Sequence, residues 1–102
     1  MSVRMEREEG RMIAYLSGEI DHHSAKEMRE TIDFSAEGYL PNTLVLDFSS
    51  VTFMDSSGIG LVMGRYRLMK SMNGVLVVRN VSDHIKRVMR LAGLDKLAVI
   101  EQ

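Results

Sequence analysis

The amino-acid sequence predicts a single α/β domain, in which helices pack on a mixed, mainly parallel sheet of about five strands. Short β-branched and apolar runs alternate with segments of helical periodicity, which is typical of a sheet connected by crossover helices. The first two strand-like runs are separated only by a tight turn, which predicts an antiparallel pair at the start. The chain has 102 residues without a linker, repeat or low-complexity tract, so one domain is expected over residues 1–102.

The first two strands are expected at residues 3–9 and 11–17, joined by a turn at Glu9-Gly10. Side chains of the second strand alternate between two faces, as strand geometry requires. One face takes Ile13 and Tyr15, and the other takes Met12, Ala14 and Leu16.

A first helix is expected after residues 18–21, with Asp21 placed to cap its N-terminus. Apolar residues recur at helical spacing along it, at Ala25, Met28, Ile32 and Ala36. Gly38 is predicted to end this helix, and Pro41 marks the following loop. Residues 43–48 are apolar and β-branched and end in Asp47-Phe48, which predicts a buried parallel strand.

The second half repeats this alternation. A long helix is expected to about Met72, with its apolar face formed by Ile59, Val62, Met63, Tyr66 and Met69 and its end at Asn73-Gly74. A strand follows at residues 75–78, and Ser82 caps a third helix that carries Ile85, Val88 and Met89. Gly93 stops that helix before a last strand at residues 97–100. The predicted order is β-β-α-β-α-β-α-β, with right-handed crossovers making the later strands parallel.

The segment from Phe53 to Gly60, Phe-Met-Asp-Ser-Ser-Gly-Ile-Gly, is the most informative feature of the chain. It places two hydroxyls and two glycines at the first turn of the second helix, beyond the carboxyl end of a strand. Free N–H groups and the positive dipole end stabilise negative charge at such a turn. A serine at this place could cap the helix, bind an anion or carry a phosphate.

Composition excludes several classes of function. The chain has no cysteine, which excludes disulfides, thiol catalysis and cysteine-ligated zinc. No apolar run approaches the roughly 20 residues that cross a bilayer, and residues 1–6 lack the apolar stretch of a signal peptide. A soluble, cytoplasmic protein is therefore expected, without membrane association.

Charge is distributed unevenly between the two halves. Residues 1–51 hold 5 Lys or Arg against 10 Asp or Glu, and residues 52–102 hold 8 against 4. The basic residues of two predicted helices form either solvated helix faces or a surface for an acidic protein patch; they are Arg65, Arg67, Lys70, Lys86, Arg87 and Arg90. Nucleic-acid binding is not expected, because the chain is not basic overall and carries no known motif.

Catalytic, metal and cofactor sites are not expected. A serine hydrolase would need a base from His22, His23 or His84, and Met54 occupies the first glycine position of the Gly-x-Ser-x-Gly pattern. The adjacent histidines indicate surface positions of a first helical turn rather than metal ligands. Glycines at 58, 60 and 64 follow an expected strand end by about nine residues, so they match neither dinucleotide nor P-loop patterns. Gly58 and Gly60 are instead expected to let a partner or a phosphate approach the backbone, whereas Gly64 is expected to serve packing.

Two motifs in order carry a family resemblance that covers nearly the whole chain. One runs from Leu46 through the Asp-Ser-Ser-Gly segment to Tyr66, and the other covers Gly18-Glu19-Ile20-Asp21-His22-His23-Ser24-Ala25. The sequence resembles the STAS-domain anti-sigma factor antagonists, in particular the sporulation sigma F branch. The family usually carries one more helix after the final strand, whereas this sequence stops at Gln102.

The resemblance implies a STAS-like fold and a regulatory binding protein that is not an enzyme. The unphosphorylated form would bind an anti-sigma factor that is a serine kinase, free the sigma factor, and be switched off by phosphorylation at Ser56. A serine phosphatase would reset it. Residues implied to contact the kinase are Asp21, Asp55, Ser57, Gly58 and Gly60. Two alternatives stay open: an antagonist in a stress-response sigma pathway, and a STAS-type anion or nucleotide sensor that uses the helix N-terminus.

Overall fold

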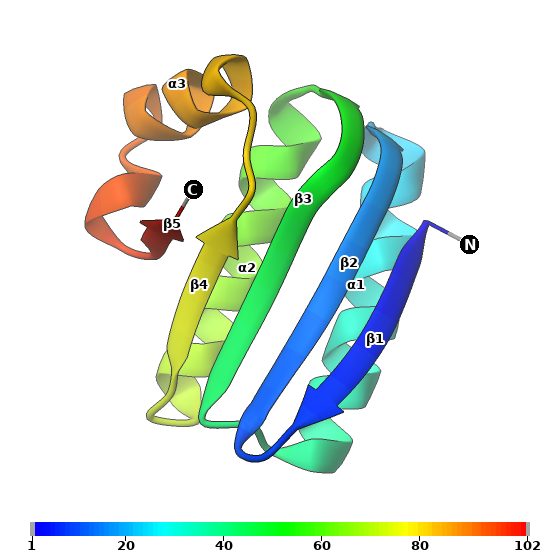
Figure 1. Cartoon of the computed structure of the whole chain (residues 1–102), viewed down its shortest axis with the longest axis vertical. Helices are drawn as coiled ribbons and strands as arrows, with labels where there is room; N and C mark the ends of the chain where they lie inside the picture. The colour runs from blue at the N-terminus through cyan, green and yellow to red at the C-terminus, as the bar shows by residue number, and fades with distance from the viewer. Residues whose placement is uncertain (1, 102) are drawn as a thin grey trace.

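Five strands lie side by side in chain order in the computed structural model of the chain, which describes residues 2–101 (Figure 1). They are β1 (Val3–Glu8), β2 (Arg11–Ile20), β3 (Thr43–Met54), β4 (Val75–Arg79) and β5 (Val99–Glu101). β1 pairs antiparallel with β2, and every later pairing is parallel. The mixed, mainly parallel sheet and the predicted order of elements are confirmed.

Two long helices, α1 (His22–Tyr39) and α2 (Ser56–Ser71), cover one face of this sheet and leave the other face open (Figure 1). A shorter helix, α3 (Asp83–Leu91), and the 3-10 helix η1 (Leu94–Lys96) lie at the β4–β5 side. The predicted caps are confirmed, because the Asp21 carboxylate and the Ser82 hydroxyl each accept a hydrogen bond from the first helical turn that follows them.

The core lies between the sheet and the helices. Side chains along β2 point alternately into this core and onto the opposite face of the sheet. Met12, Ala14 and Leu16 point into it, whereas Ile13 and Tyr15 belong to the open face. From α1 the core receives Met28, Ile32 and Ala36, all fully buried as their helical spacing predicts.

The prediction that the strand beginning at residue 43 ends at residue 48 is wrong, because β3 continues to Met54. The polar pair Ser49-Ser50 resembles a loop signal, but β2 also extends to Ile20, and the two strands stay paired beyond the end of β4. The register between the two strands shifts twice along this extension, because β3 carries an extra residue opposite residues 15–17 and another opposite Gly18-Glu19; Gly18 lies in the left-handed region at φ 81°. β3 therefore ends directly before Asp55, and the expected gap of about nine residues between strand and glycines is wrong.

Two other boundaries differ from the sequence expectation. Gly38 does not end α1, which continues to Tyr39 and closes with Leu40 in the left-handed region at φ 54°. The last strand is shorter and later than predicted, because the N–H groups of Leu97 and Ala98 donate to the Leu94 carbonyl at 3.0 and 2.9 Å and so belong to the turn that ends η1. Both changes lie away from the Asp-Ser-Ser-Gly turn.

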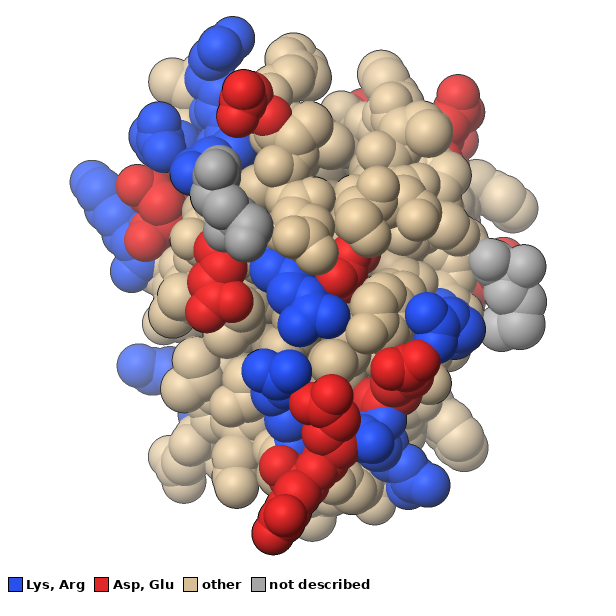
Figure 2. All heavy atoms as spheres, viewed as in Figure 1, with Lys and Arg blue, Asp and Glu red and all other residues tan. Residues whose placement is uncertain are grey.

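The open face of the sheet is crossed by a polar row that joins four strands (Figure 2). Arg4 lies over the Tyr15 ring, 4.3 Å from its centre, and Arg79 donates to the Tyr15 hydroxyl at 3.3 Å. The carboxylate of Asp47 accepts hydrogen bonds from Arg79 Nε at 2.8 Å, Asn80 Nδ2 at 3.0 Å and the Ser49 hydroxyl at 2.6 Å. This carboxylate is therefore held ionised on a nearly buried side chain, 3% exposed.

Acid is expected to weaken the fold through Asp47. Burial alone would raise the pKa of this carboxyl, but hydrogen bonds from Ser49, Arg79 and Asn80 outweigh it and lower the pKa. Its contribution to stability is therefore present above the pKa of an unfolded aspartate, about 3.9, and is lost as the pH falls through the lower folded value. Urea unfolding across this range should show the loss for the wild type and a flatter profile for Asp47→Asn; parallel profiles would contradict the assignment.

Candidate functional site

The carboxyl ends of β2 and β3 lie side by side. The N–H of Asp55 donates to the carbonyl of Ile20 at 3.1 Å, which ties the start of α2 to the residue before Asp21. Both motifs therefore meet at one end of the sheet, each as an aspartate that begins a helix. Open α/β sheets place binding sites at such strand ends.

Asp55, and neither serine, caps α2. Its carboxylate accepts the Ser57 N–H at 2.7 Å, and its carbonyl accepts the Gly58 N–H at 3.0 Å. Ser56 is consequently the first residue of the helix and is exposed, whereas Ser57 is half-buried. The Ser56 hydroxyl is thus not used as a cap and stays available to another molecule at the positive end of α2.

Asp21 builds a more complete cap at the start of α1. Its carboxylate accepts the N–H groups of His23 at 3.0 Å and Ser24 at 2.9 Å, and the Ser24 hydroxyl accepts the Asp21 N–H at 3.0 Å. The pKa of Asp21 is lowered mainly by the hydrogen bond from the Ser24 N–H, with further contributions from the Ser24 hydroxyl and the His23 N–H. Burial would raise this pKa, but the hydrogen bonds outweigh it. Asp21 is therefore an anion at neutral pH on the same end of the sheet as Ser56.

The two glycines of the turn have different surroundings. Gly58 is buried, and a Cβ there would come within 2.1 Å of Met54 Cγ, so this glycine makes room for the Met54 side chain. Gly60 is exposed, and a Cβ added to it would meet no other atom within 4 Å. Of the two glycines, only Gly60 presents bare backbone on the surface of α2.

Phe53 is a surface residue that the sequence did not single out as a candidate. Its side chain is 52% exposed on the extension of β3, two residues before Asp55. An aromatic residue in a strand-like run usually indicates core, but the alternation of β3 buries Met54 and turns Phe53 outward. An exposed aromatic beside the serines adds an apolar contact to the site.

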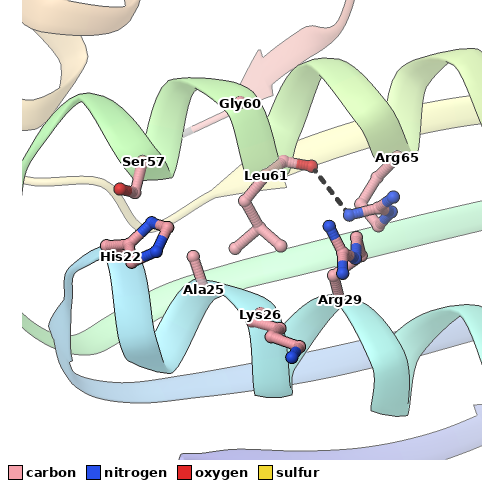
Figure 3. Close-up of a pocket in the computed structure, with 8 residues that line it drawn as sticks. All are labelled: His22, Ala25, Lys26, Arg29, Ser57, Gly60, Leu61 and Arg65. Atoms are coloured by element: carbon pink, nitrogen blue, oxygen red, sulfur yellow. Dashed lines mark hydrogen bonds between the residues drawn. The ribbon is translucent and has the colours of Figure 1, made fainter.

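A cleft of about 340 Å³ opens between α1 and α2 beside this turn (Figure 3). His22 and Ser57 face one another at its end, and both histidines of the pair lie exposed in the first turn of α1, as expected. Within residues 2–101, no group of three or more His, Cys, Asp or Glu side chains could hold a metal ion. In the same range, no helix is long and apolar enough to cross a membrane.

Comparison with known proteins places the chain in a family. The model of the STAS domain matches residues 2–102. The anti-sigma F factor antagonist of Paenibacillus polymyxa is 34% identical over 100 residues, which are 98% of this chain and 86% of that protein. The anti-sigma-B factor antagonist of Bacillus subtilis is 30% identical over 94 residues, 92% of this chain and 84% of that protein.

Solved structures of the anti-sigma factor antagonist SpoIIAA have the same fold. Its unphosphorylated form superimposes with a TM-score of 0.84 at 29% identity, covering 98% of this chain and 88% of that one. The phosphorylated form of SpoIIAA from Bacillus gives a TM-score of 0.77 at 29% identity, covering 98% and 91%. The fold, the matched domain and these relatives lead to one conclusion: the chain belongs to the STAS domain family and, within it, to the anti-sigma factor antagonists.

Proposed function

We propose that this protein is an anti-anti-sigma factor whose unphosphorylated form binds an anti-sigma serine kinase in the cytoplasm and thereby frees a sigma factor. The single observation that carries the proposal is the exposed Ser56 at the first position of α2, with its hydroxyl unused by the Asp55 cap. Relatives named anti-sigma factor antagonists support the role, and SpoIIAA has been solved with and without phosphate. The protein acts by binding and not by catalysis.

Phosphorylation of Ser56 by the partner kinase, with ATP as the phosphate donor, switches this binding off. It adds about −1.5 to −2 charges to one small side chain. The N-terminus of α2 tolerates that charge, because a helix dipole stabilises an anion there by about 0.3–1 kcal/mol. The fold therefore persists while the surface presented to the kinase becomes more negative, and a serine phosphatase restores the binding form.

Residues around Ser56 form the proposed docking surface. Asp21 and Asp55 give it negative charge and fixed helix starts, and Ser57 lies on the next position of the same turn. Phe53 adds an exposed apolar contact, and Gly60 leaves the backbone of α2 open one turn further on. Gly58 contributes from beneath, since it lets Met54 pack under the turn.

A reconstitution with purified components tests this function. The chain is mixed with a complex of the anti-sigma kinase and its sigma factor, and the released sigma factor is measured by size-exclusion chromatography and by transcription from its promoter. Release that depends on the unphosphorylated chain supports the proposal. A chain that neither binds the kinase nor releases any sigma factor would contradict it.

The same assay can determine in which sigma-factor pathway the protein acts. The similarity to a sigma F antagonist and to a sigma-B antagonist leaves sporulation and stress response as candidates, with the higher identity on the sigma F side. We propose the sporulation pathway first. Parallel reactions with the sigma F and the sigma-B anti-sigma kinases decide between them by which kinase releases its sigma factor.

Adding one methyl group at Gly60 is expected to weaken kinase binding by about tenfold while stabilising the fold. Alanine gains about 0.5–1 kcal/mol over glycine inside a helix, but its methyl would intrude on a surface that another molecule approaches. Gly38→Ala is the matched control, because Gly38 is an exposed glycine near the far end of α1 with equally open surroundings. Isothermal titration with the kinase should separate the two variants; equal affinities would remove Gly60 from the docking surface.

A further inference from the structure

The strand β1 forms one edge of the sheet and, in the part of the chain that the structure describes, pairs only with β2 (Figure 1). The Ser17 N–H donates to the Ser2 carbonyl at 2.8 Å, which fixes the alternation of backbone groups along β1. Residues at even positions direct their N–H and C=O groups toward β2. The groups directed to the outer edge belong to the odd positions Val3, Met5 and Arg7. Such a row of backbone groups is a template for a further strand.

An exposed apolar patch lies beside this edge, on the face of the sheet that α1 covers. The Phe34 side chain of α1 is 83% exposed, and it lines a groove of about 380 Å³ together with Met5, Met12 and Tyr39. Met5 is only half-buried by its own chain. Aromatic and thioether side chains next to an open strand edge offer apolar contacts to whatever strand pairs there.

The charges of β1 select one register for pairing with an identical strand. Two copies related by a two-fold axis perpendicular to the sheet pair their β1 strands antiparallel, with the helices of both on the same face. With Met5 opposite Met5, each Arg4 lies opposite Glu6 of the second copy. Because side chains alternate with a period of two, the neighbouring registers differ by two residues. They place Arg4 opposite Arg4 or Glu6 opposite Glu6, and like charges directly opposite one another are destabilising.

We propose that β1 pairs with β1 of a second copy of this chain, so that two five-stranded sheets form one continuous sheet. The outward backbone groups of Val3 and Arg7 then exchange hydrogen bonds across the axis, and those of Met5 do so with Met5 of the second copy. The two Met5 side chains meet on the α1 side of the sheet, flanked by both Phe34 rings. Charges that oppose pairing in the other registers are attractive in this one.

This interface leaves the proposed kinase-docking surface accessible. β2 lies between β1 and β3, and β3 ends directly before Asp55 and Ser56. A dimer therefore presents two copies of the docking surface to its partners. A short strand edge and one patch bury less area than a standard interface, so a dissociation constant of about 10 μM is expected.

Analytical ultracentrifugation of the full chain from about 1 to 500 μM measures this association. The wild type should shift from monomer to dimer over this range. Arg4→Glu and Glu6→Arg should each weaken association at least about tenfold, because the two-fold axis repeats the altered contact. Combining Arg4→Glu with Glu6→Arg in one chain restores opposite charges in the same register and should restore the dimer. A wild type that stays monomeric throughout, or a combined variant as weak as the single ones, would overturn the proposal.

The apolar patch is tested by Phe34→Ala, which should also weaken the dimer. Leu91→Ala is its matched control, because Leu91 is 84% exposed on α3, far along the sheet from β1. Both variants remove an exposed apolar side chain from a helix, so neither should disturb the core. Equal dimer affinities of these two variants would contradict the proposed interface.

Single cysteines test the register, since the chain has no cysteine of its own. Opposite residues of a hydrogen-bonded antiparallel pair have Cα atoms about 5.5 Å apart, within the range that a disulfide spans. Met5→Cys should therefore form a disulfide-linked dimer under mild oxidation, whereas Arg7→Cys, which lies opposite Val3, should not. Equal cross-linking of both variants would contradict the register. If the chain is monomeric and Glu6→Arg instead weakens kinase binding, the β1 edge belongs to the kinase and the proposal is wrong.

Discussion

Replacing Ser56 by aspartate is expected to weaken binding to the anti-sigma kinase by about 100-fold. Phosphorylation of Ser56 should weaken the binding further, because phosphate carries more negative charge than aspartate. An anion that is pressed against a partner without a matching arginine cluster loses hydration, and Asp21 and Asp55 already make this end of the sheet acidic. A penalty of about 3 kcal/mol corresponds to a change in affinity of roughly 100-fold. Ser56→Ala should bind tightly and persistently, because it can never be phosphorylated.

The dissociation constants of both variants should be measured by titration with the kinase in its ADP form. Ser71→Asp is the control for added charge alone, since Ser71 is exposed at the opposite end of the same helix. It should bind within a few-fold of wild type. Equal, tight binding by Ser56→Ala and Ser56→Asp would mean that charge at Ser56 is not the release signal.

Removing the carboxylate of Asp33 is expected to cost about 3 kcal/mol of folding free energy, the low end for a broken buried ion pair. Arg65 would then keep a buried charge with no acidic partner, since its side chain is 6% exposed and its two-point contact with Asp33 is lost. The low end applies because the Asp33 side chain is itself 28% exposed. Burial raises the pKa of Asp33 although Arg65 opposes the shift, which agrees with a pair that is costly to form and costly to break.

Thermal unfolding of Asp33→Ala should show a midpoint lowered by more than about 10 °C, since each kcal/mol shifts a domain of this size by about 4–8 °C. Adding Arg65→Met should restore part of the loss, because an apolar side chain carries no charge to bury. Glu8→Ala is the control: it breaks the exposed pair with Arg11, which contributes at most about 1 kcal/mol. Equal midpoints for Asp33→Ala and Glu8→Ala would contradict the burial argument.

The element order and the sheet were predictable because each segment carries its own signal. The alternation around Ile13 and the helical spacing of Met28, Ile32 and Ala36 depend only on local geometry, and the structure follows both. The end of β3 was not predictable in this way. Ser49 and Ser50 look like a loop, and the strand continues through them because Ser17, near the end of β2, pairs with Ser50 from a distant part of the sequence.

The candidate site was likewise predictable only in part from the sequence. Asp21, Asp55 and the two serines were identified from motif and capping chemistry, and the structure brings their helix starts together through the bond from Asp55 to Ile20. The exposure of Phe53 and the cleft with Lys26, Arg29 and Arg65 depend on how strands and helices are oriented in space. A pattern along one chain segment carries no information about such neighbours.

The central claim is that Ser56 carries the phosphate that switches this protein off. The most direct measurement incubates the wild type, Ser56→Ala and Ser57→Ala with the anti-sigma kinase and ATP, and then determines intact mass and the modified residue by mass spectrometry. The account predicts one added phosphate on Ser56 in the wild type and in Ser57→Ala, and none in Ser56→Ala. Phosphate that persists in Ser56→Ala and disappears in Ser57→Ala would contradict it.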